Sequence, residues 1–232
     1  MIDYFKRGLD NLEKGNYQEA KSDFTKAIKI NSNHVEAYFN RGIAYYRMQN
    51  YTQALKDYTK SIELNPDYAN VYNNRGVVYA DMKNYTQALK DYTKSIELNP
   101  DYAKAYNNRG NAYAFGFDNY SQAILDYSKA IDLNPNYAEA YNNRGIAYFY
   151  FKKYSKALSD FTKAIELNPN FVEACYNRGF IYVLKNNLSR ACADWQKAHQ
   201  LGHKDALELI NKYCKKKIGP EEALELINKF YK

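Results

Sequence analysis

Apolar and small residues recur along this chain at helical spacing, in two stretches that repeat with a fixed period. The glycines that mark the period are Gly8, Gly42, Gly76, Gly110, Gly145 and Gly179, and they are 34, 34, 34, 35 and 34 residues apart. Counting 34 slots from Met1, the helical pattern covers about slots 2 to 14 and about slots 18 to 31 of each unit. The pattern predicts an all-α array of six two-helix repeats, at 1–34, 35–68, 69–102, 103–137, 138–171 and 172–205.

Turn signals separate the predicted helices. Asn-Pro pairs, the first at 65/66, are expected to end the second helices, because the residue before proline is pushed out of the helical region. The predicted N-caps of the following first helices are Asp67, Asp101, Asn136 and Asn170. Those of the second helices are Thr52, Thr86, Ser121 and Ser155. The one spacing of 35 comes from an extra residue in AFGFDNY at 114–120, which we expect to be a loop insertion.

The residues in fixed slots resemble those of a known family. In the third repeat they are Tyr72, Gly76, Tyr79, Ala88, Tyr92, Ser95 and Pro100, a pattern similar to the tetratricopeptide repeat. The resemblance covers residues 1–205 and departs from the usual pattern in having Tyr for Trp at the first aromatic slot and Arg for Leu before the glycine. It implies a right-handed superhelical solenoid whose first helices line a concave groove.

An arginine precedes each glycine, on the side of the first helix that faces the packed layer. A buried arginine needs a partner, and the second helix of every repeat offers an aspartate at a matching place. The predicted pairs are Arg7 with Asp23, Arg41 with Asp57, Arg75 with Asp91, Arg109 with Asp126, Arg144 with Asp160 and Arg178 with Asp194. The sequence leaves open whether each pair lies within a repeat or joins it to the next.

Asparagines occupy the opposite face of the predicted first helices, and we expect them to line the groove. An Asn amide has both a donor and an acceptor, so a ladder of them suits the backbone of an extended peptide. The predicted ladder is Asn40, Asn74, Asn108, Asn143 and Asn177, with Asn73, Asn107 and Asn142 beside it. Predicted contacts that select side chains include Lys104, Asn111, Phe115, Phe149, Tyr150, Tyr176 and Phe180, with Ile43, Tyr46, Val77 and Asp81 among the other variable neighbours.

The sequence therefore predicts a non-enzymatic scaffold that binds an extended segment of a partner protein in the groove. An open alternative is that the asparagines are only solvated or bond to one another across repeats. Some tetratricopeptide proteins hold acidic C-termini in a clamp of Lys, Asn and Arg; here only the asparagines and Lys104 match, so that clamp is not predicted. Self-assembly and binding of single-stranded RNA remain alternatives, although few cations face the groove and nucleic acid is not the expected partner.

No cofactor or metal is expected, since neither a catalytic grouping nor a phosphate-binding glycine loop occurs. The pair His199 and His203 is a weak candidate for metal, because Gly202 is expected to end that helix. The net charge of +7 is spread along all 232 residues and argues only weakly for acidic partners. Without an apolar run of membrane length, we expect no membrane insertion and a cytoplasmic location. The three cysteines suggest reduced thiols rather than a disulfide framework.

A short second repeat lies near the C-terminus. ALELINKYCK at 206–215 recurs as ALELINKFYK at 223–232, identical at eight of ten places. The apolar stripe of Ala206, Leu207, Leu209, Ile210 and Tyr213 is expected to cap the sixth repeat, so that 206–232 forms capping helices. Residues 219–232 could fold onto the stack, be an appended tail or join copies of the chain into a homo-oligomer.

Overall fold

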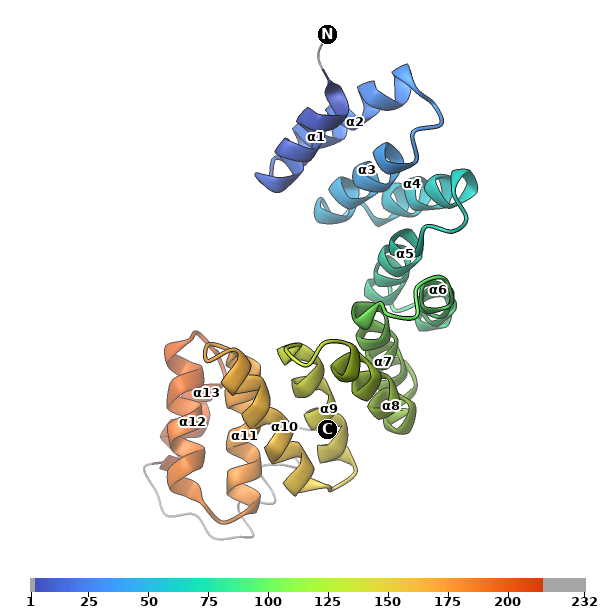
Figure 1. The fold of residues 1–232 in the computed structure, drawn as a ribbon. Helices are drawn as coiled ribbons and strands as arrows, with labels where there is room; N and C mark the ends of the chain where they lie inside the picture. The colour runs from blue at the N-terminus through green and yellow to red at the C-terminus, as the bar shows by residue number, and fades with distance from the viewer. Residues whose placement is uncertain (1–2, 215–232) are drawn as a thin grey trace. The chain divides into compact units, whose positions relative to one another are not determined.

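A computed structural model describes residues 3–214, and these form helices without strands (Figure 1). The chain divides into two compact units at Asp118 and Asn119, within the fourth predicted repeat. The predicted helices 219–232 lie outside the described residues. Each unit is a stack of helices that pack in chain order, which confirms the all-α class.

Unit 1 contains seven helices that pack in chain order. They are α1 (Tyr4–Glu13), α2 (Tyr17–Ile30), α3 (Val35–Arg47), α4 (Tyr51–Leu64), α5 (Ala69–Asp81), α6 (Tyr85–Leu98) and α7 (Ala103–Phe117). Each helix contacts the next one along the chain, and the first helices α1, α3, α5 and α7 also contact each other in sequence. A first helix therefore has packed neighbours on several sides.

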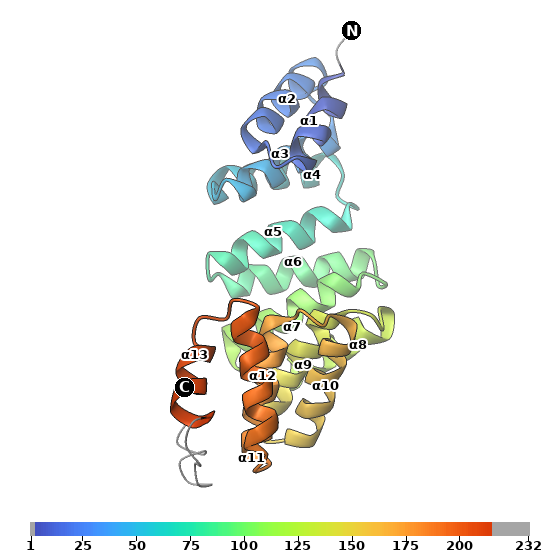
Figure 2. The same cartoon turned by 90° about the vertical axis from the view of Figure 1, so that its left-hand side faces the viewer.

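The described part of unit 2 repeats the arrangement and adds a short cap after its last helix pair. Its elements are α8 (Tyr120–Leu133), α9 (Ala138–Tyr150), α10 (Tyr154–Leu167), α11 (Val172–Leu184), α12 (Leu188–Gln200), α13 (Ala206–Leu209) and a π-helical turn, η1 (Ile210–Cys214). Both α13 and η1 pack on α12, and α13 lies beside α12 in Figure 2.

Asparagine side chains close the turns at positions other than those predicted. Asn84 is the N-cap of α6 and accepts a hydrogen bond from the Gln87 backbone N–H, whereas the predicted cap Thr86 lies inside the helix. At the junctions between repeats, Asn65 Oδ1 accepts from the Asp67 N–H and Tyr68 becomes the N-cap of α5, without a side-chain bond. The cap predictions were wrong by one or two residues because an Asn side chain can accept from the backbone N–H two or three residues ahead.

The extra residue of the fourth repeat lengthens a helix instead of forming a loop. Helix α7 has 15 residues where α5 has 13, and its C-cap Asp118 adopts the left-handed conformation. A Cβ atom on Gly116 would lie 2.5 Å from Cγ of Tyr85. The loop prediction was wrong because glycine at this place lets the lengthened C-terminal end of α7 pass the Tyr85 ring.

The periodic glycines are places where an aromatic ring of the second helix touches the backbone of the first. A Cβ atom on Gly76 would lie 2.7 Å from Cε1 of Tyr92, which is 2% exposed. The rings that face Gly8, Gly42, Gly145 and Gly179 in the same way are Phe24, Tyr58, Phe161 and Trp195. Each contact brings the two helices of a repeat close together.

Five of the inward arginines form a two-pronged ion pair with the aspartate of their own repeat. Arg75 Nε and Nη2 donate to the two carboxylate oxygens of Asp91, both at 2.8 Å. The same geometry joins Arg7 with Asp23, Arg41 with Asp57, Arg144 with Asp160 and Arg178 with Asp194. These five predicted pairs are confirmed, and each lies within its repeat. In the first repeat, the hydrogen bond from Arg7 holds the pKa of Asp23 below its usual range.

The remaining guanidinium nitrogen, Nη1, donates to a side chain of the preceding repeat. Arg75 Nη1 donates to Thr59 Oγ1 on α4 at 3.1 Å, and the guanidinium carbon lies 5.7 Å from the Tyr72 ring centre. The equivalent donor and acceptor pairs are Arg41 with Thr25, Arg109 with Thr93, Arg144 with Ser128 and Arg178 with Thr162. One side chain thus connects three helices, which sequence could not specify.

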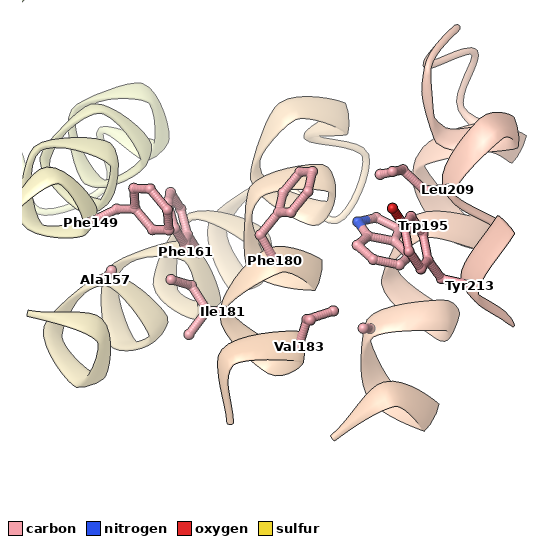
Figure 3. Packing of buried hydrophobic residues seen from close by; sticks show 10 residues of the cluster. Phe149, Ala157, Phe161, Phe180, Ile181, Val183, Trp195, Leu209 and Tyr213 are labelled. Carbon is pink, nitrogen blue, oxygen red and sulfur yellow. The ribbon is translucent and has the colours of Figure 1, made fainter. Parts of the chain in front are cut away.

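An apolar cluster packs the cap against α11 and α12 of unit 2 (Figure 3). Trp195 is fully buried there against Phe180, and Leu209 and Tyr213 from the cap belong to the same cluster. Ala206 is also fully buried, so the predicted capping stripe is packed, except that Leu207 is 44% exposed.

A disulfide joins Cys192 on α12 to Cys214 at the end of η1, while Cys175 is a buried free thiol. The prediction of reduced thiols was therefore wrong for two of the three cysteines. The turn after α12 folds the chain back on itself and brings residues 22 apart in sequence within bonding distance.

Removing the guanidinium of Arg75 is expected to destabilise the stack. The change Arg75→Ala leaves the carboxylate of Asp91, which is 6% exposed, without its counter-charge, and the free energy of unfolding should fall by about 3 kcal/mol. Urea unfolding followed by circular dichroism measures the change, with the exposed Arg47→Ala as control. The double variant Arg75→Met/Asp91→Leu should recover much of the loss. An unchanged urea midpoint for Arg75→Ala would contradict the structural role.

Candidate functional site

The predicted asparagine ladder separates into exposed and buried members. Asn73 is fully buried, Asn107 and Asn142 are each 5% exposed and Asn177 is 9% exposed. The half-buried members are Asn40, Asn74, Asn108 and Asn143. The outward placement of the four buried residues was wrong, because a first helix packs against the first helices of neighbouring repeats as well as against its own second helix.

In unit 1 a buried amide holds two partly exposed amides in place. Asn108 Nδ2 on α7 donates to Asn73 Oδ1 on α5 at 2.9 Å, and Asn73 Nδ2 donates to Asn74 Oδ1 at 3.2 Å. Asn73 thus uses both ends of its amide to orient a neighbour on its own helix and one on the next repeat. The alternative that the asparagines bond to one another across repeats thus holds for Asn73 and Asn108, and the bonds fix the directions of Asn74 and Asn108.

The same bridge recurs in unit 2. Asn177 Nδ2 donates to Asn142 Oδ1 at 3.2 Å, and Asn142 Nδ2 donates to Asn143 Oδ1 at 3.4 Å. The second repeat lacks it, because buried Phe39 stands in the bridging slot. Asn40 donates instead to the Glu36 carbonyl one turn earlier on its own helix, at 2.8 Å. Asn40 is therefore not joined to the asparagines of the later repeats by these bonds.

A hollow of about 430 Å³ opens along the first helices of unit 1. Its lining residues are Ile43, Tyr46, Arg47, Tyr58, Asn74, Val77, Lys104 and Asn108. Arg47 and Lys104 are exposed cations at its wall, and Ile43 and Val77 supply an apolar surface. The hollow therefore combines two positive charges, two oriented amides and an apolar patch.

A second hollow, of about 260 Å³, adjoins the first and shares Val77 and Asn108 with it. It is lined also by Ala80, Asp81, Tyr85, Tyr92, Asn111, Ala112 and Phe115. The Tyr46 hydroxyl donates to Asp81 Oδ2 at 2.8 Å, and burial together with this bond raises the pKa of Tyr46 to about 12. At neutral pH Tyr46 is thus protonated and remains a donor to the carboxylate. Phe115 is 63% exposed, so its ring is open to a ligand.

The aromatic residues predicted in the C-terminal part of the groove mostly belong to the core of unit 2. Phe180 is fully buried and Phe149 is 7% exposed. Tyr176 stacks under His203 with ring centres 3.8 Å apart. Tyr150 is the more accessible ring, 41% exposed and stacked on Tyr120 at 4.3 Å. The prediction that Phe149 and Phe180 contact a ligand was wrong, because both side chains fill the interior.

The structure also brings in residues that the sequence reasoning missed. Arg47 and Tyr85 line the two hollows and were not among the predicted contacts. Arg47 follows Ile43 by four residues and so lies on the same helix face, a spacing that could have identified it. Tyr85 is the first residue of the second helix α6, whereas the predicted contacts all lie on first helices.

Residues 3–214 contain neither a candidate membrane-spanning helix nor a candidate metal site. Within that range no helix is long and apolar enough to cross a membrane. The same range contains no group of three or more His, Cys, Asp or Glu side chains that could hold a metal ion. His203 instead stacks on Tyr176.

Family models match most of the chain. A tetratricopeptide repeat model matches residues 35–68, 69–102 and 138–171, and a second one matches 91–124 and 161–200. A TPR repeat model matches 8–49 and 118–150. No catalytic family is among these matches, and no curated protein matches the sequence.

Several solved structures are similar to this chain. YrrB, described as a TPR protein with an unusual peptide-binding site, is 26% identical, with a TM-score of 0.62 over 81% of this chain and 97% of its own. MamA is 27% identical, with a TM-score of 0.62 over 74% of this chain and 97% of its own. PilF of Pseudomonas aeruginosa, at 18% identity, shows the fold alone, with a TM-score of 0.80 over 90% of this chain and 96% of its own.

The family matches agree with the paired helices and with the contacts between glycines and aromatic rings. The relatives support a protein-interaction scaffold. The chain belongs to the tetratricopeptide repeat family.

Proposed function

We propose that unit 1 binds an extended peptide segment of a partner protein along α3, α5 and α7. The observation that carries the proposal is the pair of adjoining hollows that share Val77 and Asn108. A peptide that runs through both would pass the Asn74 and Asn108 amides. The peptide-binding site named for YrrB supports a ligand of this class.

The amide geometry suits a peptide backbone. Asn74 uses its oxygen to accept from Asn73, and Asn108 uses one Nδ2 hydrogen to donate to Asn73. The Asn74 Nδ2 group can therefore donate to a peptide C=O, and Asn108 Oδ1 can accept from a peptide N–H. Such bonds read the backbone and leave side-chain selection to the rest of the wall.

The buried bridge lowers the cost of binding. Asn73 is fully buried and holds both exposed amides in fixed directions before a ligand arrives. A ligand then loses less free energy in ordering side chains, which increases affinity. Asn73 thus acts as a positioning residue and does not touch the peptide.

Charge in the first hollow selects the peptide. Arg47 and Lys104 face it, whereas the Asp81 carboxylate of the second hollow accepts from Tyr46. We infer that the peptide residue in the first hollow is acidic and that an apolar or aromatic residue packs near Phe115. Arg47 lies outside the slots of the carboxylate clamp known in other tetratricopeptide proteins.

Recognition of the backbone predicts sensitivity to N-methylation. A binder is selected from an array of random synthetic 12-residue peptides, and each of its peptide nitrogens is methylated in turn. Methylation of the N–H bound by Asn108 should lower affinity about tenfold, the effect of losing one hydrogen bond that leaves a polar group unpaired. Fluorescence anisotropy of the labelled peptide measures the dissociation constant.

Asparagine variants test whether Asn108 causes the loss of affinity on N-methylation. Asn108→Ala should weaken the parent peptide and abolish the difference between it and its methylated form. Asn40→Ala is the matched control, since it changes the same slot outside the Asn73 bridge, and it should bind normally. Equal binding by Asn108→Ala and wild type would overturn the proposal.

The cation pair predicts a preference for an acidic peptide. Replacing the selected acidic residue by its amide should weaken binding to wild type by about 1 kcal/mol, and the loss should be smaller in 0.5 M salt because screening weakens exposed charge pairs. The double variant Arg47→Ala/Lys104→Ala should show no such difference. The double variant Lys56→Ala/Lys90→Ala carries the same change in net charge on exposed positions of α4 and α6 and should keep the preference. Loss of the preference in both double variants would indicate long-range charge instead of a site.

A further inference from the structure

The cap of unit 2, which consists of α13 and η1, packs its apolar side chains on one face formed by α11 and α12. Leu209 and Tyr213 enter the apolar cluster around Trp195, and the Tyr213 and Trp195 ring centres are 6.4 Å apart. Ala206 packs in a neighbouring cluster with Cys175 and Ala198. Ala206 and Leu209 are fully buried and Tyr213 is 4% exposed. These three side chains therefore define how the segment docks.

The same docking residues occur a second time in the chain. Positions 206, 209 and 213 correspond to Ala223, Leu226 and Phe230, and the partly buried Ile210 corresponds to Ile227. Even the left-handed Gly202 of the preceding turn has an equivalent in Gly219. Phe230 keeps the ring of Tyr213. The second segment thus carries a counterpart of Ala206, Leu209, Ile210 and Tyr213.

The two segments differ at the disulfide. Cys214 of the first copy is bonded to Cys192 on α12, whereas the second copy has Tyr231 at the matching position. The first segment can therefore be fixed covalently to the face, and the second cannot.

We propose that residues 223–232 are an alternative occupant of the α11–α12 face in the same molecule, and that the Cys192–Cys214 disulfide determines which segment docks. In the oxidised chain the first copy is fixed. A dithiol reductant supplies two electrons and two protons, so the disulfide becomes two thiols and the reductant becomes a disulfide. The first copy is then free to leave, and the second copy can take its place.

A segment of the same molecule is favoured over one from another copy of the chain. Moving from the first docked segment to the second shifts the chain by 17 residues (223 minus 206), which enlarges the connecting turn and keeps the segment tethered. Loop closure costs grow slowly with length, and a short tether gives an effective concentration on the order of millimolar. Another molecule would reach that concentration only in a concentrated solution.

A relocated cysteine tests the proposal in the full chain. In Cys214→Ser/Tyr231→Cys the thiol at position 231 should reach Cys192 if the second copy docks in the same register. In a glutathione buffer the two thiols lose two electrons and two protons to oxidised glutathione, which becomes two reduced molecules. Peptide mapping by mass spectrometry should find the 192–231 crosslink in most molecules, and a non-reducing gel should show a monomer.

Matched variants show whether a crosslink to Cys192 comes from specific docking of the second copy or from random collision of the two thiols. Cys214→Ser/Lys229→Cys places the thiol at the match of the exposed Lys212 and should give little crosslink to Cys192. Adding Leu226→Asp to the trapping variant should abolish the crosslink, while adding Leu209→Asp should increase it by weakening the first copy. Circular dichroism and the fluorescence of Trp195, the single tryptophan, check that each variant is folded.

Three outcomes overturn the proposal. The first is absence of the 192–231 crosslink in folded protein. The second is an equal yield from the position 229 variant, which would show undirected contact. The third is a crosslink found only in dimers, which would place the second copy on another molecule. None of these results bears on peptide binding by unit 1, so the two proposals fail independently.

Discussion

The stack depends on a guanidinium that joins three helices, its own and two others that accept its hydrogen bonds. Arg75 donates two hydrogen bonds to Asp91 within its repeat and one to Thr59 in the repeat before it. A charge in this layer is tolerated only with a complete set of partners. The arrangement therefore fixes both the spacing of the two helices in a repeat and the contact with the preceding one. Glycine at the next position lets the Tyr92 ring approach the same stretch of backbone.

This constraint also determines where the asparagines point. Asn73, Asn74 and Arg75 are consecutive on α5, so fixing the arginine toward the second helix leaves the other two on the remaining sides. Asn73 meets the neighbouring first helix and bridges to Asn108, while Asn74 is only half-buried beside the hollow. One short sequence thus supplies the ion pair, the bond between repeats and a surface amide.

Much of the architecture could be predicted from the sequence, because it repeats. The helix pairs follow from the 34-residue period, and the ion pairs follow from an arginine and an aspartate that recur together in every repeat. Burial of Asn73 could not be predicted in the same way, since periodicity orients a helix toward its own partner but says nothing of the next repeat. The longer α7 depends on one local contact of Gly116 with Tyr85, and the disulfide depends on the turn after α12. Features that arise from a single contact carry no periodic signal.

The central claim is that the arginines build the stack while the exposed asparagines bind the ligand. A crystal structure of the full chain with the selected 12-residue peptide tests it most directly. The account predicts an extended peptide on unit 1, with Asn108 Oδ1 accepting from a peptide N–H, Asn74 Nδ2 donating to a peptide C=O and the Arg75–Asp91 pair unchanged. A peptide bound without contact to Asn74 or Asn108, or a guanidinium turned from Asp91 to the ligand, would contradict it.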